Sequence, residues 1–278
     1  MDRELVLFLL AVVAAGGDAQ AVGWWPPVTD MSSNGRVLER IAWRRLWTPL
    51  LPAALLLAAL GGWAVVEPEQ SESVPVAFMA SAVPFVALLL RAVRRALRAL
   101  DLSKIEVVAA TVGLVRPRVI VSSRLADLLE DDALKAVREH EQAHAWHRDP
   151  LRMWIAQLAT DLQWPWTGSA RRFDAWRETL ELARDEEARC QGVEGPDLAA
   201  GVLAAARLGG DRGRVAVASA ADAPASLRVR VLRLLQPLAP EERLPASRLL
   251  WVVMLLATAA ALGAAFGERL IPAVFALV

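Results

Sequence analysis

The three histidines of this chain all lie between positions 140 and 147. His140 and His144 are four residues apart, and Glu141 directly follows the first. Residues four apart on an α-helix lie on one face, so both imidazoles can bind one ion. A His-Glu-x-x-His sequence is the metallopeptidase pattern, in which the carboxylate takes a proton from a water that attacks a peptide carbonyl. The motif predicts one catalytic Zn²⁺, with His140 and His144 as ligands and Glu141 as general base.

A catalytic zinc ion takes three protein ligands and keeps a fourth position open for water. Glu181 and Asp185 are four residues apart in a predicted helix. We expect Glu181 to be the third ligand, and Asp185 to accept a hydrogen bond from a ligating histidine. Glu178 is the competitor for the ligand role, but Leu182 occupies the position four residues after it. The alternative is that this helix presents only a solvated acidic face.

Other polar residues near the motif receive different predictions. A fourth protein ligand would close a catalytic site, so His147 is expected at the surface. The chain has no tyrosine, so stabilisation of an oxyanion is left to Arg172, Arg177, a backbone amide or no group at all. Cys190 is the single cysteine, which excludes an intrachain disulfide, and it is predicted to be a small buried residue with a metal-ligand role as the alternative.

Short elements must position these residues. Ile105–Val108 and Leu114–Val121 are rich in β-branched residues and flank Gly113, which predicts a two-stranded element. A helix is expected to begin at Asp131 and to run through the motif to Asp149-Pro150. Further helices are predicted at 151–163, 171–189, 197–208 and 226–235.

The composition predicts a membrane protein. The chain has 278 residues, of which 55% are hydrophobic, and its mean hydropathy is +0.35. Membrane spans are predicted at about 5–25, 46–66 and 74–90, and a further span begins near 249. The expected domains are a membrane region at 1–90, a zinc peptidase domain at 91–247 and a span with a short tail at 248–278. The alternative for the first run is a cleaved signal peptide. The alternative for any one of these runs is a buried core helix of a folded domain.

The charges around these runs predict the orientation. Arginines precede the second run, glutamates follow it, and arginines follow the third run at Arg91, Arg94, Arg95 and Arg98. Positively charged loops stay in the cytosol. We therefore expect a multi-pass protein of the bacterial inner membrane with its peptidase domain in the cytosol. The formal net charge is zero, so direct binding of nucleic acid is not expected.

A larger set of residues resembles the BlaR/MecR-type regulatory membrane metallopeptidases over roughly 75–240. The set comprises Arg116-Pro117, Val119–Ser122, Leu125, Leu128, Leu129, Val137–His144, Arg148–Leu151, Glu181-x-x-x-Asp185 and Leu227–Leu235. The resemblance implies a mainly α, multi-span membrane protein with a cytosolic α+β zincin-like (gluzincin) domain. It also implies cleavage of a transcriptional repressor, or of the protein itself, in signal transduction. Arg184 departs from the cysteine common in antibiotic sensors. No penicillin-binding domain is expected after Glu268, so a separate sensor partner or the membrane would supply the signal.

Two other functions compete with this interpretation. Membrane quality-control and prenyl-protein proteases share the motif, but they place membrane spans between the motif and the acidic ligand. In this sequence, charged residues are spread between His144 and Glu181, so no membrane span fits there. A non-catalytic signalling protein with a structural zinc site is the other alternative, although a structural site needs no base at Glu141.

The substrate is predicted to be a cytosolic protein or peptide that pairs as an extended strand with Leu114–Val121, with Arg116, Val119 and Val121 as contacts. Arg116, Arg118 and Arg124 would favour acidic side chains. The alternative is that these strands only brace the motif helix.

Overall fold

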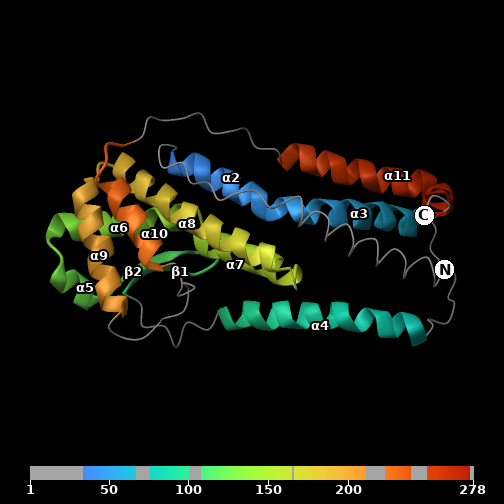
Figure 1. The fold of residues 1–278 in the computed structure, drawn as a ribbon, viewed down its shortest axis with the longest axis horizontal. Helices are drawn as coiled ribbons and strands as arrows, with labels where there is room; N and C mark the ends of the chain where they lie inside the picture. Colours follow the sequence, from blue (N-terminus) through green and yellow to red (C-terminus); the bar gives the residue numbers. More distant parts are fainter. Residues whose placement is uncertain are drawn as a thin grey trace.

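The computed structural model describes residues 34–66, 76–99, 108–164, 166–210, 223–238 and 249–275. Helices dominate these ranges, and the only strands among them form a two-stranded antiparallel sheet (Figure 1). The predicted first span at about 5–25 lies outside the described residues. In chain order the elements are α2 (Gly35–Trp47), the 3-10 helix η1 (Thr48–Leu50), α3 (Leu51–Val66), α4 (Val76–Ala99), β1 (Ala109–Val112), β2 (Arg118–Val121), α5 (Ser123–Leu128), α6 (Asp131–Trp146), α7 (Asp149–Leu162), α8 (Thr167–Cys190), α9 (Gly195–Gly210), α10 (Ala223–Leu234) and α11 (Leu249–Phe275).

The motif helix α6 begins and ends where local chemistry dictates. Asp131 and Asp132 lie in its first turn, where carboxylates stabilise the positive end of the helix dipole. The helix ends because Arg148 adopts a left-handed conformation with φ 52°. Pro150 then occupies the first turn of α7, a position that needs no amide hydrogen. This sharp break turns the chain directly after the motif and places Asp149 beside it.

Two apolar clusters hold the helices around α6. One joins Ala136 of α6 to Ala188 of α8, Leu198 of α9 and Leu234 of α10. The other is formed by α2, α7 and α8, and its members are Ala42, Leu46, Ala156, Phe173, Trp176 and Leu180. Helix α2 therefore shares a buried core with the helices around the motif, although it lies far before the motif in the sequence. The predicted division of the chain at 90 and 247 stays a prediction.

The predicted two-stranded element is present, with a different first strand and with a second strand that begins at Arg118 instead of Leu114. β1 spans Ala109–Val112 and pairs with β2 in the register Thr111 to Val119. The segment 105–107, which was predicted to be strand, lies outside the described residues. Gly113 turns the chain with φ 98°, and a Cβ there would lie 2.8 Å from the Arg116 carbonyl oxygen. The hairpin lies against α6, as Figure 1 shows.

Helices α3 and α11 pack side by side along their lengths (Figure 1). Their backbones approach closely at two glycines: a Cβ on Gly62 would lie 1.9 Å from the Ala260 oxygen, and one on Gly263 would lie 1.7 Å from the Ala59 oxygen. Small residues at such a crossing permit close helix packing. Among the residues that the structure describes, no helix is both long enough and apolar enough to span a membrane.

Candidate metal centre

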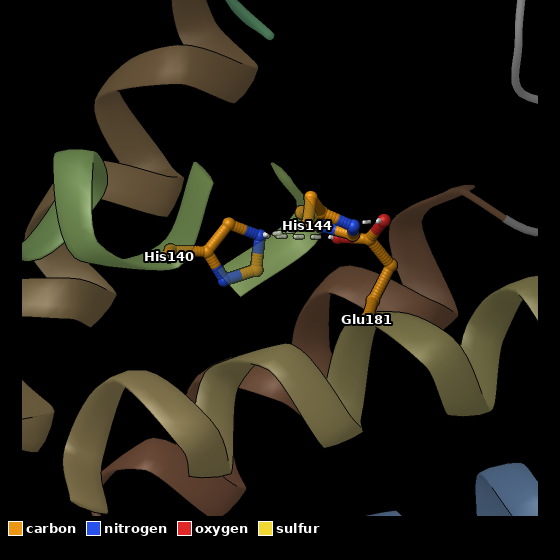
Figure 2. Close-up of side chains that lie close together, drawn as sticks. All are labelled: His140, His144 and Glu181. Carbon is orange, nitrogen blue, oxygen red and sulfur yellow. Dashed lines mark hydrogen bonds and ion pairs between the residues drawn. The ribbon is translucent and has the colours of Figure 1, made fainter. Parts of the chain in front are cut away.

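Helix α6 places His140 and His144 on one buried face, and α8 brings Glu181 opposite them (Figure 2). The two Nε2 atoms are 3.2 Å apart. The Nε2 atoms of His140 and His144 lie 3.6 and 3.7 Å from the Glu181 carboxylate oxygens. The three residues predicted as ligands therefore converge, because one ligand atom from each lies within 4.8 Å of the others.

These distances fit a tetrahedral zinc ion. Nitrogen and oxygen ligands at about 2.0–2.2 Å from such an ion lie about 3.3–3.5 Å from one another. The spacings of 3.2, 3.6 and 3.7 Å agree with that geometry to within a few tenths of an ångström. The Glu181 side chain is 36% exposed, whereas those of the histidines are 8% and 10% exposed. The site is thus open on the Glu181 side, where a fourth ligand can enter.

A carboxylate stands behind each histidine. The Nδ1–H of His144 donates to Asp149 Oδ2 at 2.9 Å. His140 Nδ1 lies 2.9 Å from Asp185 Oδ1, although the pair is not aligned as a regular hydrogen bond. Both carboxylates favour a proton on Nδ1, which leaves each Nε2 lone pair free for a metal. Asp185 thus lies beside the ring of His140, and its predicted role as a hydrogen-bond acceptor stays a prediction.

Asp149 is a site residue to which the sequence analysis gave no role of its own, since it placed Asp149-Pro150 at a helix end and within the resembling set Arg148–Leu151. It is fully buried and lies against Arg184, with Nε–Oδ2 and Nη2–Oδ1 distances of 2.5 and 3.1 Å. Burial would raise the pKa of the Asp149 carboxyl, but the bonds to His144 and Arg184 outweigh burial and lower it. Asp149 is therefore an anion that orients His144. An acidic residue just after the motif was the only sequence signal for it.

Arg230 of α10 is the second residue that was missed. It donates through Nε and Nη2 to the two oxygens of Asp185 at 2.9 and 2.8 Å, and its Nη1 lies 2.9 Å from Glu181 Oε2. Burial opposes ionisation of Glu181, but the charge of Arg230 and the bond to His140 lower the pKa of Glu181 well below its usual value. One guanidinium thus fixes both Glu181 and Asp185 of α8. The sequence analysis covered Arg230 only as part of the predicted helix at 226–235 and of the resembling stretch Leu227–Leu235.

The site without a metal favours a proton on His140. Burial acts to lower the pKa of His140, but the interactions of its ring with the nearby carboxylates of Asp185 and Glu181 outweigh burial and raise the pKa to about 10. A cavity that stabilises one positive charge between carboxylates also suits a cation, and a metal must displace that proton when it binds.

The predicted base, Glu141, is held by the hairpin. Thr111 of β1 donates its hydroxyl to the Glu141 carbonyl oxygen at 2.7 Å and lies 2.9 Å from Glu141 Oε2. A shared hydroxyl hydrogen lets Thr111 restrain both the backbone and the carboxylate of Glu141. The predicted β-element thus has a direct role at the site, through a residue that the sequence analysis did not name.

Several other predictions concern residues near the site. Glu178 is exposed, and Glu181 rather than Glu178 joins the histidines. His147 is exposed, as predicted, and its Nε2 lies 2.9 Å from Glu187. Cys190 is exposed, so the prediction of a buried cysteine is wrong; it ends α8, where no further turn covers it.

The guanidinium that contacts Glu181 and Asp185 is that of Arg230, whereas the predicted oxyanion candidates contact other groups. Arg172 donates to Gln163 Oε1 at 3.2 Å. Arg177 lies 3.9 Å from Asp174 and over the ring of Phe173. Among these arginines, Arg230 is the one that reaches the ligand Glu181.

The residues predicted to contact substrate lie on β2 and in the turn before it. Val119 and Val121 line a cavity of about 400 Å³ together with Arg138, Glu139 and Gln142 of α6. Gln142 lies about 200° around the helix from His140, so this cavity faces away from the metal ligands. Arg116 is exposed in the turn. β1, through Thr111, is the strand that contacts the predicted base Glu141.

The arrangement of two histidines, a glutamate ligand and a restrained glutamate base is that of a zinc metallopeptidase. Residues 97–171, about a quarter of the chain, match peptidase family M48. Residues 97–171 are therefore similar to a peptidase M48 domain, and the enzyme class that the match and the metal site support is zinc metallopeptidase. The match includes the histidine motif and ends before Glu181, which the structure supplies. No curated protein and no solved structure matches the chain. The finer BlaR/MecR subtype is not specifically supported by the match.

Proposed function

We propose that this protein is a membrane-anchored zinc endopeptidase of the bacterial inner membrane that cleaves a cytosolic regulatory protein, such as a transcriptional repressor, or itself. The observation that carries the catalytic part is the convergence of His140, His144 and Glu181 beside a glutamate that Thr111 restrains. The regulatory part rests on the resemblance to BlaR/MecR-type proteins, and the M48 match gives it no further support.

Each residue at the site has one task in peptide hydrolysis. His140, His144 and Glu181 hold a single zinc ion, which supplies a water of lowered pKa and polarises the scissile carbonyl. Glu141 takes the proton of the attacking water and passes it to the leaving amine. Asp149 and Asp185 keep the ligating rings oriented. Arg230 offsets part of the negative charge of Glu181 and Asp185, so the site carries less negative charge when a peptide carbonyl acquires charge.

The outer edge of β1 is the strand edge best placed to receive a substrate. Ser122 N donates to the Val108 oxygen, and the register pairs Ala109 with Val121. Hydrogen-bonded and non-bonded pairs alternate in an antiparallel ladder, so the amides and carbonyls of Ala109 and Thr111 point away from β2. An extended peptide can pair there beside Glu141. We therefore move the proposed substrate strand from Leu114–Val121 to β1.

Membrane anchoring is proposed from the apolar runs and from the surface that they present. Helix α3 contains no charged residue, and apolar side chains of α4 and α11 are exposed. These side chains are Val83, Val86, Leu89, Leu90, Val93 and Leu97 on α4, and Trp251, Val253, Met254, Leu255 and Leu262 on α11. Exposed apolar side chains of this number on two helices are suited to contact with lipid. At its basic end, α4 is tied to the peptidase core because Arg95 lies 2.6 Å from the buried Asp161.

The catalytic proposal is tested with Glu141→Gln and Glu181→Ala. Purified Glu141→Gln protein should retain one zinc ion per chain and lose hydrolysis, because the base is removed and the ligands stay. Glu181→Ala should lose zinc, whereas Glu178→Ala, the matched control on the same helix, should keep it. Full hydrolysis by Glu141→Gln, or full zinc content in Glu181→Ala, would overturn the assignment.

The location is tested with the native cysteine. Cys190 is exposed at the end of α8, so a membrane-impermeant thiol reagent should label it in lysed cells and leave it unlabelled in intact cells. Labelling in intact cells would place the peptidase domain outside and refute the cytosolic location.

The substrate class is tested by comparing the proteomes of cells that express the wild type and Glu141→Ala. Fragments of cytosolic regulators that require Glu141 are expected. If the dependent fragments come solely from integral membrane proteins, the quality-control alternative replaces the regulatory one.

A further inference from the structure

Helix α2 is bound to the catalytic unit by polar contacts as well as by its apolar face. Both carboxylate oxygens of Glu186 lie 2.7 Å from the backbone nitrogen of Gly35, at the start of α2. Arg233 of α10 lies 3.0 Å from the same carboxylate. α2 lies along α8 in Figure 1. Its first turn is thus fixed to the two helices that carry Glu181, Asp185 and Arg230.

A second set of contacts runs from the middle of α2 to a metal ligand. Glu39 forms a short ion pair with Nη2 of Arg152 on α7. The Nη1 of the same guanidinium lies 2.9 Å from Asp149 Oδ1. The other oxygen of Asp149, Oδ2, accepts the Nδ1–H of His144 at 2.9 Å. Three contacts therefore connect α2 to a ligand, and every carboxylate and guanidinium in the series is charged.

We propose that Glu39 and Arg152 are positioning residues for the metal centre, so that the docking of α2 sets how strongly His144 holds the zinc ion. This inference rests on the proposed zinc site, and it adds that the packing of α2 influences the zinc affinity of that site. α2 continues through η1 into the apolar helix α3, so the same series of contacts joins the metal site to the α3–α11 pair.

The direction of the effect follows from the charges. Arg152 draws electron density from Asp149, and Glu39 offsets that effect by neutralising Arg152. If Glu39 becomes neutral, the guanidinium acts more strongly on Asp149, whose carboxylate then becomes a weaker acceptor for the His144 Nδ1–H. A weaker acceptor makes the imidazole a poorer ligand. The unpaired guanidinium also loses one of the contacts that fix its position.

Packing around Arg152 must be separated from this electrostatic effect. Its guanidinium carbon lies 4.7 Å from the Trp43 ring centroid and 5.6 Å from that of Trp176. Glu39 also accepts a hydrogen bond from Trp176 Nε1 at 3.0 Å. Glu39→Gln is the informative change, because the amide oxygen can still accept from Trp176 while the charge is lost.

The matched control is Leu38→Ala, which removes a buried side chain of the same helix without touching the ion pairs. Zinc affinity is measured by competition with a chelator on the full-length protein, and thermal stability is measured in parallel. Glu39→Gln should weaken zinc binding about 10-fold, at the lower end of the effects of residues that orient ligands. Leu38→Ala should lower the melting temperature and leave zinc affinity unchanged.

A double-mutant cycle completes the test. Arg152→Gln and the double variant Glu39→Gln/Arg152→Gln should show nearly the same zinc affinity, since Arg152 is the group through which Glu39 is joined by direct contacts to Asp149. Additive losses, or a loss in Leu38→Ala equal to that in Glu39→Gln, would reduce α2 to a packing element and overturn the inference. If the wild type itself binds no zinc, the proposed function fails. If the wild type binds zinc and Glu39→Gln binds it equally well, only the inference fails.

Discussion

Replacing Asp149 by Asn probes the most deeply buried charge at the metal site. The carboxylate is fully buried and contacts His144, Arg152 and Arg184 at the same time. Loss of a residue that orients a ligand lowers metal affinity about 10–100-fold, which is roughly 1.4–2.7 kcal/mol at 1.36 kcal/mol per decade. The change also removes the partner of a buried guanidinium, which costs about 3–5 kcal/mol of folding stability in general. Arg184 still has Glu187 as a partner at 2.8 Å in this variant. We therefore expect a loss of folding stability at the lower end of this range.

Asp161→Asn is the matched control for this prediction. Asp161 lies on the same helix, is also buried, and pairs with Arg95 of α4. Both variants should lose stability in denaturant titrations, but only Asp149→Asn should lose zinc in a chelator competition. Equal zinc affinity in the two variants would show that Asp149 does not act on His144 and would refute the reasoning from geometry.

Three further predictions concern the base, the site without metal and the apolar helices. Thr111→Val should lower kcat about 10-fold or more with unchanged zinc content, because a hydrogen bond to a charged group is worth about 1.5–3 kcal/mol. Thr111→Ser keeps the hydroxyl and should restore the rate. A normal rate in the valine variant would contradict this role of Thr111. The pKa of His140 in the metal-free protein is raised from 6.5 to about 10, so its contribution to stability is complete below pH 6.5 and is lost as the pH rises through 10. Melting temperatures of the chelator-treated protein should therefore fall over this range, whereas the zinc-loaded protein should lack this contribution; identical pH profiles would contradict the prediction. Gly62→Ala should lower the melting temperature, because its Cβ would lie 1.9 Å from the Ala260 oxygen and overpacking costs about 1–3 kcal/mol. Gly209→Ala, where nothing lies within 4 Å of the added carbon, is the control and should not destabilise the protein.

The catalytic motif could be predicted from the sequence because its geometry is local. The helical repeat places His140 and His144 on one face whatever surrounds them. The same repeat places Glu181 and Asp185 on one face of their helix. Glu178 has no carboxylate four residues after it, and this difference favoured Glu181 over Glu178 as the third metal ligand. The helices on either side were predicted to within a few residues, since Arg148-Asp149-Pro150 and Gly192 interrupt the helical pattern.

Contacts between distant segments required the tertiary structure. The sequence carries no period that relates Arg230 to Asp185, or Thr111 to Glu141, because these pairs lie on different elements whose relative positions depend on packing. Helix α2 was visible in the sequence only as a series of arginines before an apolar run. Burial against Trp176 and Leu180 makes α2 part of the catalytic unit, and this burial brings Glu39 to Arg152. The sequence alone determined which atoms can bind the metal, because helical spacing is a property of the backbone. Only the tertiary structure decided which charges orient those atoms, because ion pairs between helices depend on how the whole chain packs.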